Sequence, residues 1–186
     1  MKRKEPIGRF SFWRPARLLL TASETADPAP EALRIRYSGY GSAGLNYIAV
    51  ETAKGRWVPA EEPLHFDASF AGAGLGASFA RTMADAEPDV TIGLVPCAVG
   101  GSPMWRWDPG TMYYTNTIAR AKAAMKVGTL KGILWHQGCS EAHVETNAFG
   151  YAERVAKMMR SFRKDLGAPD VPIVAGELGW FLDDVV

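Results

Sequence analysis

A regular alternation of two kinds of segment begins at Gly72 and limits the folds open to this chain. Short apolar runs, typical of buried strands, alternate there with stretches in which apolar residues recur every three or four positions, as in amphipathic helices. Such an alternation implies βαβ units and a mostly parallel sheet covered on both faces, so the sequence predicts an α/β protein. The expected strands are 90–95, 132–135 and 171–175, and the expected helices are 75–83, 115–127 and 147–166.

Residues 1–70 show no comparable order. They are rich in Pro and Gly and hold only short apolar runs without a sustained period, which predicts one strand and long loops. No internal repeat, low-complexity tract or linker divides the chain. We therefore expect one domain over residues 1–186, of which residues 1–55 are atypical.

Composition excludes several classes of function. The 21 Lys and Arg against 20 Asp and Glu leave a formal net charge of +1, which removes the attraction on which nucleic-acid and polybasic membrane binding depend. No run of about 18 apolar residues could span a bilayer. Cys97 and Cys139 lack the spacing of a zinc site, so no metal is expected. Arg9, Arg14 and Pro15 interrupt the apolar segment that a signal peptide needs, so none is predicted, and the sequence assigns neither a compartment nor an oligomeric state.

Two loops that directly follow expected strands hold the best site candidates, because ligands bind at the carboxyl ends of strands in open parallel sheets. Gly100 and Gly101 in the first loop can present backbone N–H groups, and Gln137 in the second offers two carboxamide donors. If the two strands are neighbours, these donors converge as an oxyanion hole requires. The alternative is structural, with Gly-Gly as a tight turn and Gln137 as an ordinary hydrogen-bonded side chain.

Four segments in a fixed order carry a resemblance: 57–65 (WVPAEEPLH), 74–80 (GLGASFA), 92–102 (IGLVPCAVGGS) and 134–142 (LWHQGCSEA). The sequence resembles the sialate O-acetylesterase and acetylxylan esterase branch of the SGNH hydrolases. The resemblance implies a three-layer α/β/α fold of SGNH or flavodoxin-like type, a serine nucleophile, a supporting role for His136 and no cofactor. It also implies an acetylated carbohydrate substrate, such as acetylated sialic acid, xylan or a related glycan.

The nucleophile is the first departure from that family. The family places it in a Gly-Gln-Ser-Asn turn after the first strand, and this tetrapeptide is absent here. The closest register is residues 18–26 (LLLTASETA), which puts Ser23 at the nucleophile position. Thr21 replaces the glycine of the turn, and a threonine resists the strained backbone that presents the hydroxyl. Ser23 is therefore interpreted either as the nucleophile or as an ordinary loop serine.

The general base is the second departure. The family carries an Asp-x-x-His motif near its C-terminus, and none occurs in these 186 residues, whose imidazoles are His65, His136 and His143. Cys139 stands where the family has a glutamate, and a thiol cannot replace a carboxylate as a charge or an acceptor. We expect a carbohydrate O-acetylesterase domain that is incomplete at both ends, with the C-terminal catalytic segment missing. The main alternative is an inactive or truncated member that retains at most sugar binding.

Two further patterns leave alternatives open. Residues 39–44 (GYGSAG) fit the Gly-x-Gly-x-x-Gly fingerprint of dinucleotide binding, which makes a dinucleotide-binding domain a remote alternative; that fingerprint needs a buried strand before it and a helix after it, and the flanking sequence indicates neither. Trp105, Trp107, Tyr113 and Tyr114 follow the Gly-Gly-Ser segment closely. They serve either core packing or flat faces for a sugar ring.

Overall fold

The computed structural model describes residues 16–23, 48–67, 69, 71–87, 90–142 and 148–178. Within these residues, six strands form one sheet in the order β3-β2-β4-β1-β5-β6. All neighbours pair in parallel except β2 and β3, which are antiparallel at one edge. The strands are β1 (Ala16–Ser23), β2 (Ile48–Glu51), β3 (Trp57–Pro59), β4 (Thr91–Pro96), β5 (Thr129–His136) and β6 (Ile173–Ala175).

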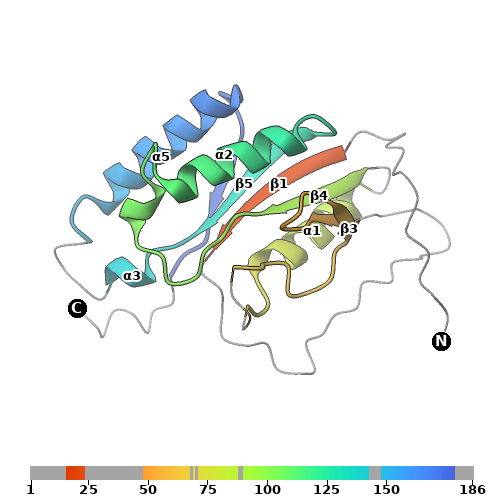
Figure 1. Cartoon of the computed structure of the whole chain (residues 1–186), viewed down its shortest axis with the longest axis horizontal. Helices are drawn as coiled ribbons and strands as arrows, with labels where there is room; N and C mark the ends of the chain where they lie inside the picture. Colours follow the sequence, from red (N-terminus) through yellow and green to blue (C-terminus); the bar gives the residue numbers. More distant parts are fainter. Residues whose placement is uncertain are drawn as a thin grey trace.

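Helices cover both faces of the sheet. Figure 1 shows α2 (Met112–Ala124) and α5 (Tyr151–Leu166) on one face and α1 (Leu75–Ala86) on the other. A short 3-10 helix, η2 (Met104–Trp107), precedes α2, and a single-turn helix, α3 (Cys139–Ala142), follows β5. The predicted α/β class with three layers is confirmed. None of the helices in the described part of the chain is long and apolar enough to cross a membrane.

Residues 92–95 of β4 and 132–135 of β5 are apolar because helices cover both faces of the sheet there. In β4, Val95 belongs to the core cluster that α2 and α5 share, whereas Ile92 and Leu94 belong to the cluster packed against α1. Successive side chains of a strand point to opposite faces, so a strand buried on both sides reads as a continuous apolar run. This is why strands β4 and β5 were predictable from the sequence.

The prediction of a single strand within residues 1–70 is wrong, since β1, β2 and β3 all lie in this range. The strands β2 and β3 have only four and three residues. Runs this short show no measurable period, and only their pairing within the sheet defines them as strands. Two other predicted features, the segment 39–44 and His143, lie outside the described residues.

Candidate active site

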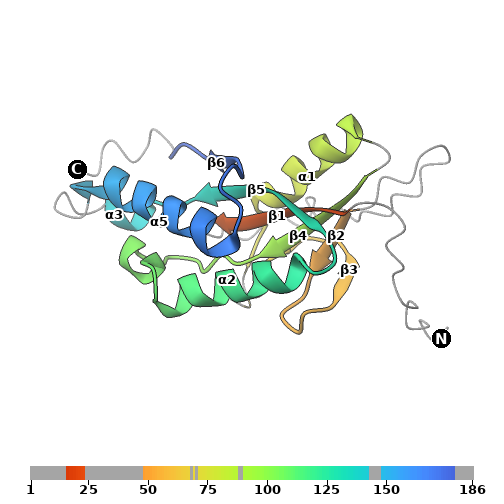
Figure 2. The same cartoon turned by 90° about the horizontal axis from the view of Figure 1, so that it is seen from above.

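The carboxyl ends of β4, β1 and β5 lie side by side, because β1 is the middle strand of the three (Figure 2). In the backbone register, Ser23 at the end of β1 pairs with His136 at the end of β5. The loop 97–103 follows β4, and Gln137 directly follows β5. The strand order therefore brings the chain segments of all the predicted site residues together at the carboxyl ends of the central strands.

A carboxylate that the sequence analysis did not single out joins two of these segments. Glu141 in α3 is only 4% exposed. Its Oε1 accepts a 2.6 Å hydrogen bond from the backbone N–H of Met104, and its Oε2 accepts a hydrogen bond from Nε2 of Gln137. A buried carboxylate is tolerated where hydrogen-bond donors surround it. Glu141 thereby ties the segment after β4 to the segment after β5.

Spacing is the signal that could have revealed Glu141. It lies four positions after Gln137, the separation at which side chains meet along a helical turn. The family resemblance implies a carboxylate at position 139, which is a cysteine in this chain. The structure holds one two positions later, at Glu141.

The carboxamide of Gln137 takes part in several hydrogen bonds and is 6% exposed. In addition to its bond with Glu141, Nε2 donates to the backbone oxygen of Ser102 at 3.2 Å. The Tyr151 hydroxyl donates to Oε1 at 2.9 Å and to the Gln137 backbone oxygen at 2.5 Å. These bonds hold the side chain against the loop that contains Gly100 and Gly101. For Nε2 to hold a substrate oxyanion, the oxyanion would have to replace the longer bond, the one to Ser102.

The two glycines differ in their surroundings. The Gly100 N–H donates to Oδ2 of Asp67 at 2.8 Å, so an oxyanion at this amide would have to displace a carboxylate. Gly101 has a φ of 64°, in the left-handed region that favours glycine. Apart from its chain neighbours, no heavy atom of the described residues lies within 4 Å of the position that a Cβ on Gly101 would occupy. Its backbone conformation, rather than lack of space, is therefore what requires glycine at this position.

Two histidines can be placed. The half-buried His136 has its Nε2 3.3 Å from the backbone oxygen of Glu177, and its ring packs on Gly176. His65 is 4% exposed, and burial lowers its pKa, with the nearby charge of Asp67 partly opposing that shift. The side chains described by the structure include no group of three His, Cys, Asp or Glu that could hold a metal ion.

The four aromatic residues that follow Gly100 and Gly101 differ in burial. Trp107 and Tyr114 are core residues, at 2% and 3% exposed, and the Trp107 indole N–H donates to Oγ of Ser102 at 2.9 Å. Trp105, in contrast, is 55% exposed. Tyr113 is half-buried and lines a cavity, so only these last two remain candidates for contact with a sugar.

A known protein family matches most of the chain. The model of the family described as carbohydrate esterase, sialic acid-specific acetylesterase matches residues 43–185. The chain belongs to this family. An Arabidopsis thaliana protein named "Probable carbohydrate esterase" is 34% identical over 139 residues, which is 70% of this chain and 54% of that protein. The chain thus spans about half the length of this curated relative.

Solved structures show the same fold. An X-ray structure of an Arabidopsis thaliana protein has a TM-score of 0.75 at 27% identity, covering 92% of this chain and 79% of the other. NanS has a TM-score of 0.67 at 18% identity, with 92% and 70% covered. A structure described as a novel carbohydrate acetylesterase from Xanthomonas citri has a TM-score of 0.58 at 19% identity, with 85% and 40% covered. The last two likenesses concern the fold alone.

Proposed function

We propose that this chain removes acetyl groups from carbohydrates by serine acyl transfer, with acetylated sialic acid, xylan or a related glycan as substrate. Membership of the carbohydrate esterase family supports the reaction class. The observation that carries the proposal is the contact between the two loops: Nε2 of Gln137 lies 3.2 Å from the backbone oxygen of Ser102, next to the Gly-Gly pair. A carboxamide and backbone amides at the carboxyl ends of the central strands are the donor types that an acyl-transfer transition state needs.

In this mechanism the hydroxyl oxygen of Ser23 attacks the acetyl carbonyl carbon, and the carbonyl oxygen becomes an oxyanion. The N–H groups of Gly100 or Gly101 and Nε2 of Gln137 hold that charge, and His136 supports the arrangement from the end of β5. The bond from the carbonyl carbon to the sugar oxygen then breaks, and the sugar leaves as an alcohol with the proton that came from Ser23. Water then hydrolyses the acetyl-serine ester, which releases acetate and restores the Ser23 hydroxyl. The base that takes the proton of Ser23 is not among the residues assigned by this proposal.

Acetate release tests the proposal, with p-nitrophenyl acetate and acetylated xylan as substrates. Because the 186 residues contain no Asp-x-x-His motif, we expect slow turnover, since a serine hydroxyl without an adjacent base is a weak nucleophile. Gln137→Ala should lower kcat by a further factor of about 10² to 10³. Thr115→Ala, at an exposed position of α2, is the matched control and should leave the rate unchanged.

Ser23→Ala then separates the remaining interpretations. Slow turnover that falls with both Ser23→Ala and Gln137→Ala supports the full proposal. Fast turnover abolished by Ser23→Ala would instead show that one of the three histidines serves as an efficient base. Turnover that falls with Gln137→Ala alone indicates an oxyanion site without its nucleophile. No turnover in any form, together with millimolar binding of acetylated sugars, favours an inactive member that only binds sugar.

A further inference from the structure

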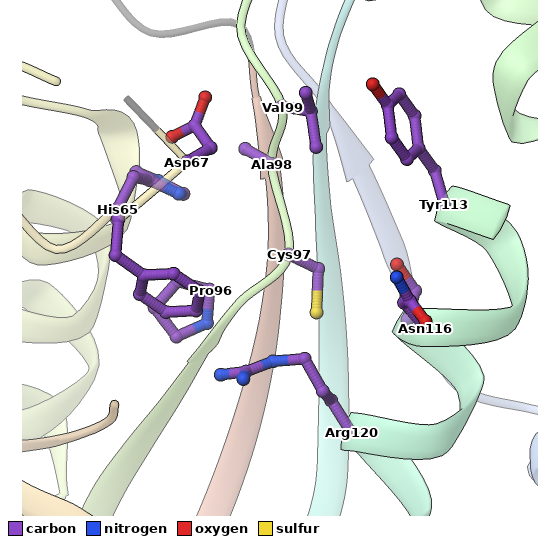
Figure 3. Close-up of a pocket in the computed structure, with 11 residues that line it drawn as sticks. His65, Asp67, Pro96, Cys97, Ala98, Val99, Tyr113, Asn116 and Arg120 are labelled. Atoms are coloured by element: carbon purple, nitrogen blue, oxygen red, sulfur yellow. The ribbon is translucent and has the colours of Figure 1, made fainter. Parts of the chain in front are cut away.

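A cavity of about 300 Å³ lies beside the candidate active site. Its walls come from three segments: His65 and Asp67 from the loop after β3, residues 96–99 from the end of β4 and the loop that follows it, and Tyr113, Asn116 and Arg120 from α2. Figure 3 shows the loop 96–99 running between the first pair and the α2 side chains. This loop continues directly into Gly100 and Gly101. The volume is at the lower end of the range of small-molecule sites, roughly 300–1,000 Å³.

The imidazole of His65 is the unexplained group in this cavity. The side chain is 4% exposed, and among the described residues neither of its ring nitrogens has a hydrogen-bond partner. Buried polar atoms in folded proteins are normally hydrogen-bonded, so an unpartnered pair on a cavity wall points to a ligand that supplies the partners. Burial lowers the pKa of His65, which keeps the ring neutral near pH 7, with one donor and one acceptor.

The other polar groups on the walls also suit hydroxyl groups. The carboxylate of Asp67 accepts hydrogen bonds, and the carboxamide of Asn116 both donates and accepts. Both residues are exposed and line the cavity. A hydroxyl group donates one hydrogen bond and accepts others, so it satisfies each of these partners, including a neutral imidazole. Several such partners around one small cavity match a ring that carries several hydroxyls.

An aromatic face completes the wall on the α2 side. The Tyr113 ring lies 5.5 Å from the Trp107 ring, at an interplanar angle of 56°, and 5.7 Å from the guanidinium of Arg106. The core side chain Trp107 on one side and Arg106 on another limit the movement of the Tyr113 ring. An aromatic ring held in this way offers an apolar surface to the C–H face of a sugar.

Charge decides between a neutral sugar and a sugar acid. Among the described residues that line the cavity, Arg120 is the one cationic group, while Asp67 contributes a negative charge. The guanidinium of Arg120 lies 4.9 Å from the ring centre of Phe66 and donates to the backbone oxygen of Thr52 at 3.4 Å. With this cation engaged by the protein and a carboxylate on the same wall, the cavity offers no excess of positive charge to a ligand carboxylate.

We propose that this cavity is a subsite for a neutral pyranose ring of the substrate, bound by His65, Asp67 and Asn116 and covered by the ring of Tyr113. This proposal rests on the proposed function, because it names the class of sugar that the cavity would hold next to the Gly-Gly loop. It favours acetylated xylose-type or hexose-type rings over sialic acid, because the carboxylate of sialic acid would enter a cavity that already holds the negative charge of Asp67.

The test measures binding separately from hydrolysis. The probes are methyl β-D-xylopyranoside, its 3-O-acetyl derivative and 9-O-acetyl-N-acetylneuraminic acid, titrated into the full chain by calorimetry. The variants are His65→Phe, which keeps a ring and removes both nitrogens, and Asn116→Ala at an exposed position where the fold is not at risk. Thr115→Ala on the same helix is the matched control. Chemical shifts of ¹⁵N-labelled imidazoles report directly on His65.

The subsite predicts that both xylosides bind and that the sialic acid derivative binds at least fivefold more weakly. Asn116→Ala should weaken xyloside binding at least fivefold, and Thr115→Ala should not change it. The ¹⁵N shifts of His65 should move with the xyloside and remain unchanged with sodium acetate. Unchanged xyloside affinity in Asn116→Ala together with unmoved His65 shifts would overturn the subsite, as would tighter binding of the sialic acid derivative. If the xylosides bind as expected but no acetate is released from the acetylated one, the subsite stands and the proposed esterase function fails.

Discussion

The carboxylate of Glu141 accepts hydrogen bonds from Met104, in the segment after β4, and from Gln137, which directly follows β5. Both donors need an acceptor because they are buried with it. A substitution that removes one of the two acceptor oxygens of residue 141 should therefore affect the position of the Gln137 carboxamide as well as the stability of the chain.

Replacing Glu141 with glutamine tests this role. The new NH₂ group would face one of the two donors, so we expect the free energy of unfolding in urea to fall by about 2 kcal/mol, the range for hydrogen bonds to a charged group. Glu61→Gln makes the same chemical change at an exposed position after β3 and should alter stability by less than about 0.5 kcal/mol. Equal effects of the two substitutions would contradict the role of Glu141.

His65 makes stability depend on pH with a defined sign. Burial holds the pKa of its imidazole below the ordinary value of 6.5, so the unfolded chain takes up a proton at a pH where the folded chain does not. Stability is therefore unaffected by this group above the unfolded pKa and falls as pH drops below 6.5, by at most about 1.4 kcal/mol per pH unit for one proton. His65→Phe removes this dependence.

Urea unfolding of both proteins between pH 7.5 and pH 5 measures the difference. Other titrating groups, such as Glu62, affect the two proteins alike and cancel in the subtraction. We expect the wild-type chain to lose stability relative to His65→Phe as pH falls. Parallel curves would mean that His65 titrates alike in the folded and unfolded chains.

At the level of elements, the contact between the ends of β5 and β6 positions His136. Gly176 directly follows β6, and a Cβ at this position would lie 2.6 Å from Cδ2 of His136. Gly176→Ala should therefore force the imidazole to move and cost about 1–3 kcal/mol of stability, as overpacking does. His136→Ala leaves room for the added methyl, so in the double variant the glycine substitution should cost less than about 0.5 kcal/mol. Additive costs in this double-mutant cycle would contradict the contact.

The elements also differ in how far the sequence alone could predict them. Residues 92–95 of β4 and 132–135 of β5 were predictable because these segments are apolar and buried. The burial of Glu141 and His65 depends on neighbours distant in the sequence, and a polar residue looks the same in a sequence whether it is buried or exposed. Gly100, Gly101 and Gln137 could be predicted as site candidates because position after a strand is a local property, whereas their hydrogen-bond partners Asp67 and Ser102 were not predictable.

At the scale of the whole molecule, the three-layer fold places the loops after β4 and β5 on either side of the end of β1. The fold is shared over 92% of this chain with an Arabidopsis thaliana structure, and the family match covers residues 43–185. Ser23 precedes that matched range, yet its strand lies at the centre of the shared sheet. The assignment of Ser23 as nucleophile therefore rests on topology and needs a chemical test of its own.

Labelling with diethyl p-nitrophenyl phosphate tests the assignment most directly, because the nucleophile forms a bond to phosphorus as p-nitrophenolate leaves. Peptide mapping by mass spectrometry should find the diethylphosphoryl group on Ser23. The labelling rate should fall about 10²-fold or more in Gln137→Ala, since in the proposed mechanism Gln137 would hold the phosphoryl oxygen in the same way as the oxyanion. Ser23→Ala should remain unlabelled, and Thr115→Ala should label as the wild-type chain does. A label on another residue, or labelling of Ser23 at the same rate in Gln137→Ala, would contradict the assignment of the nucleophile and the oxyanion site.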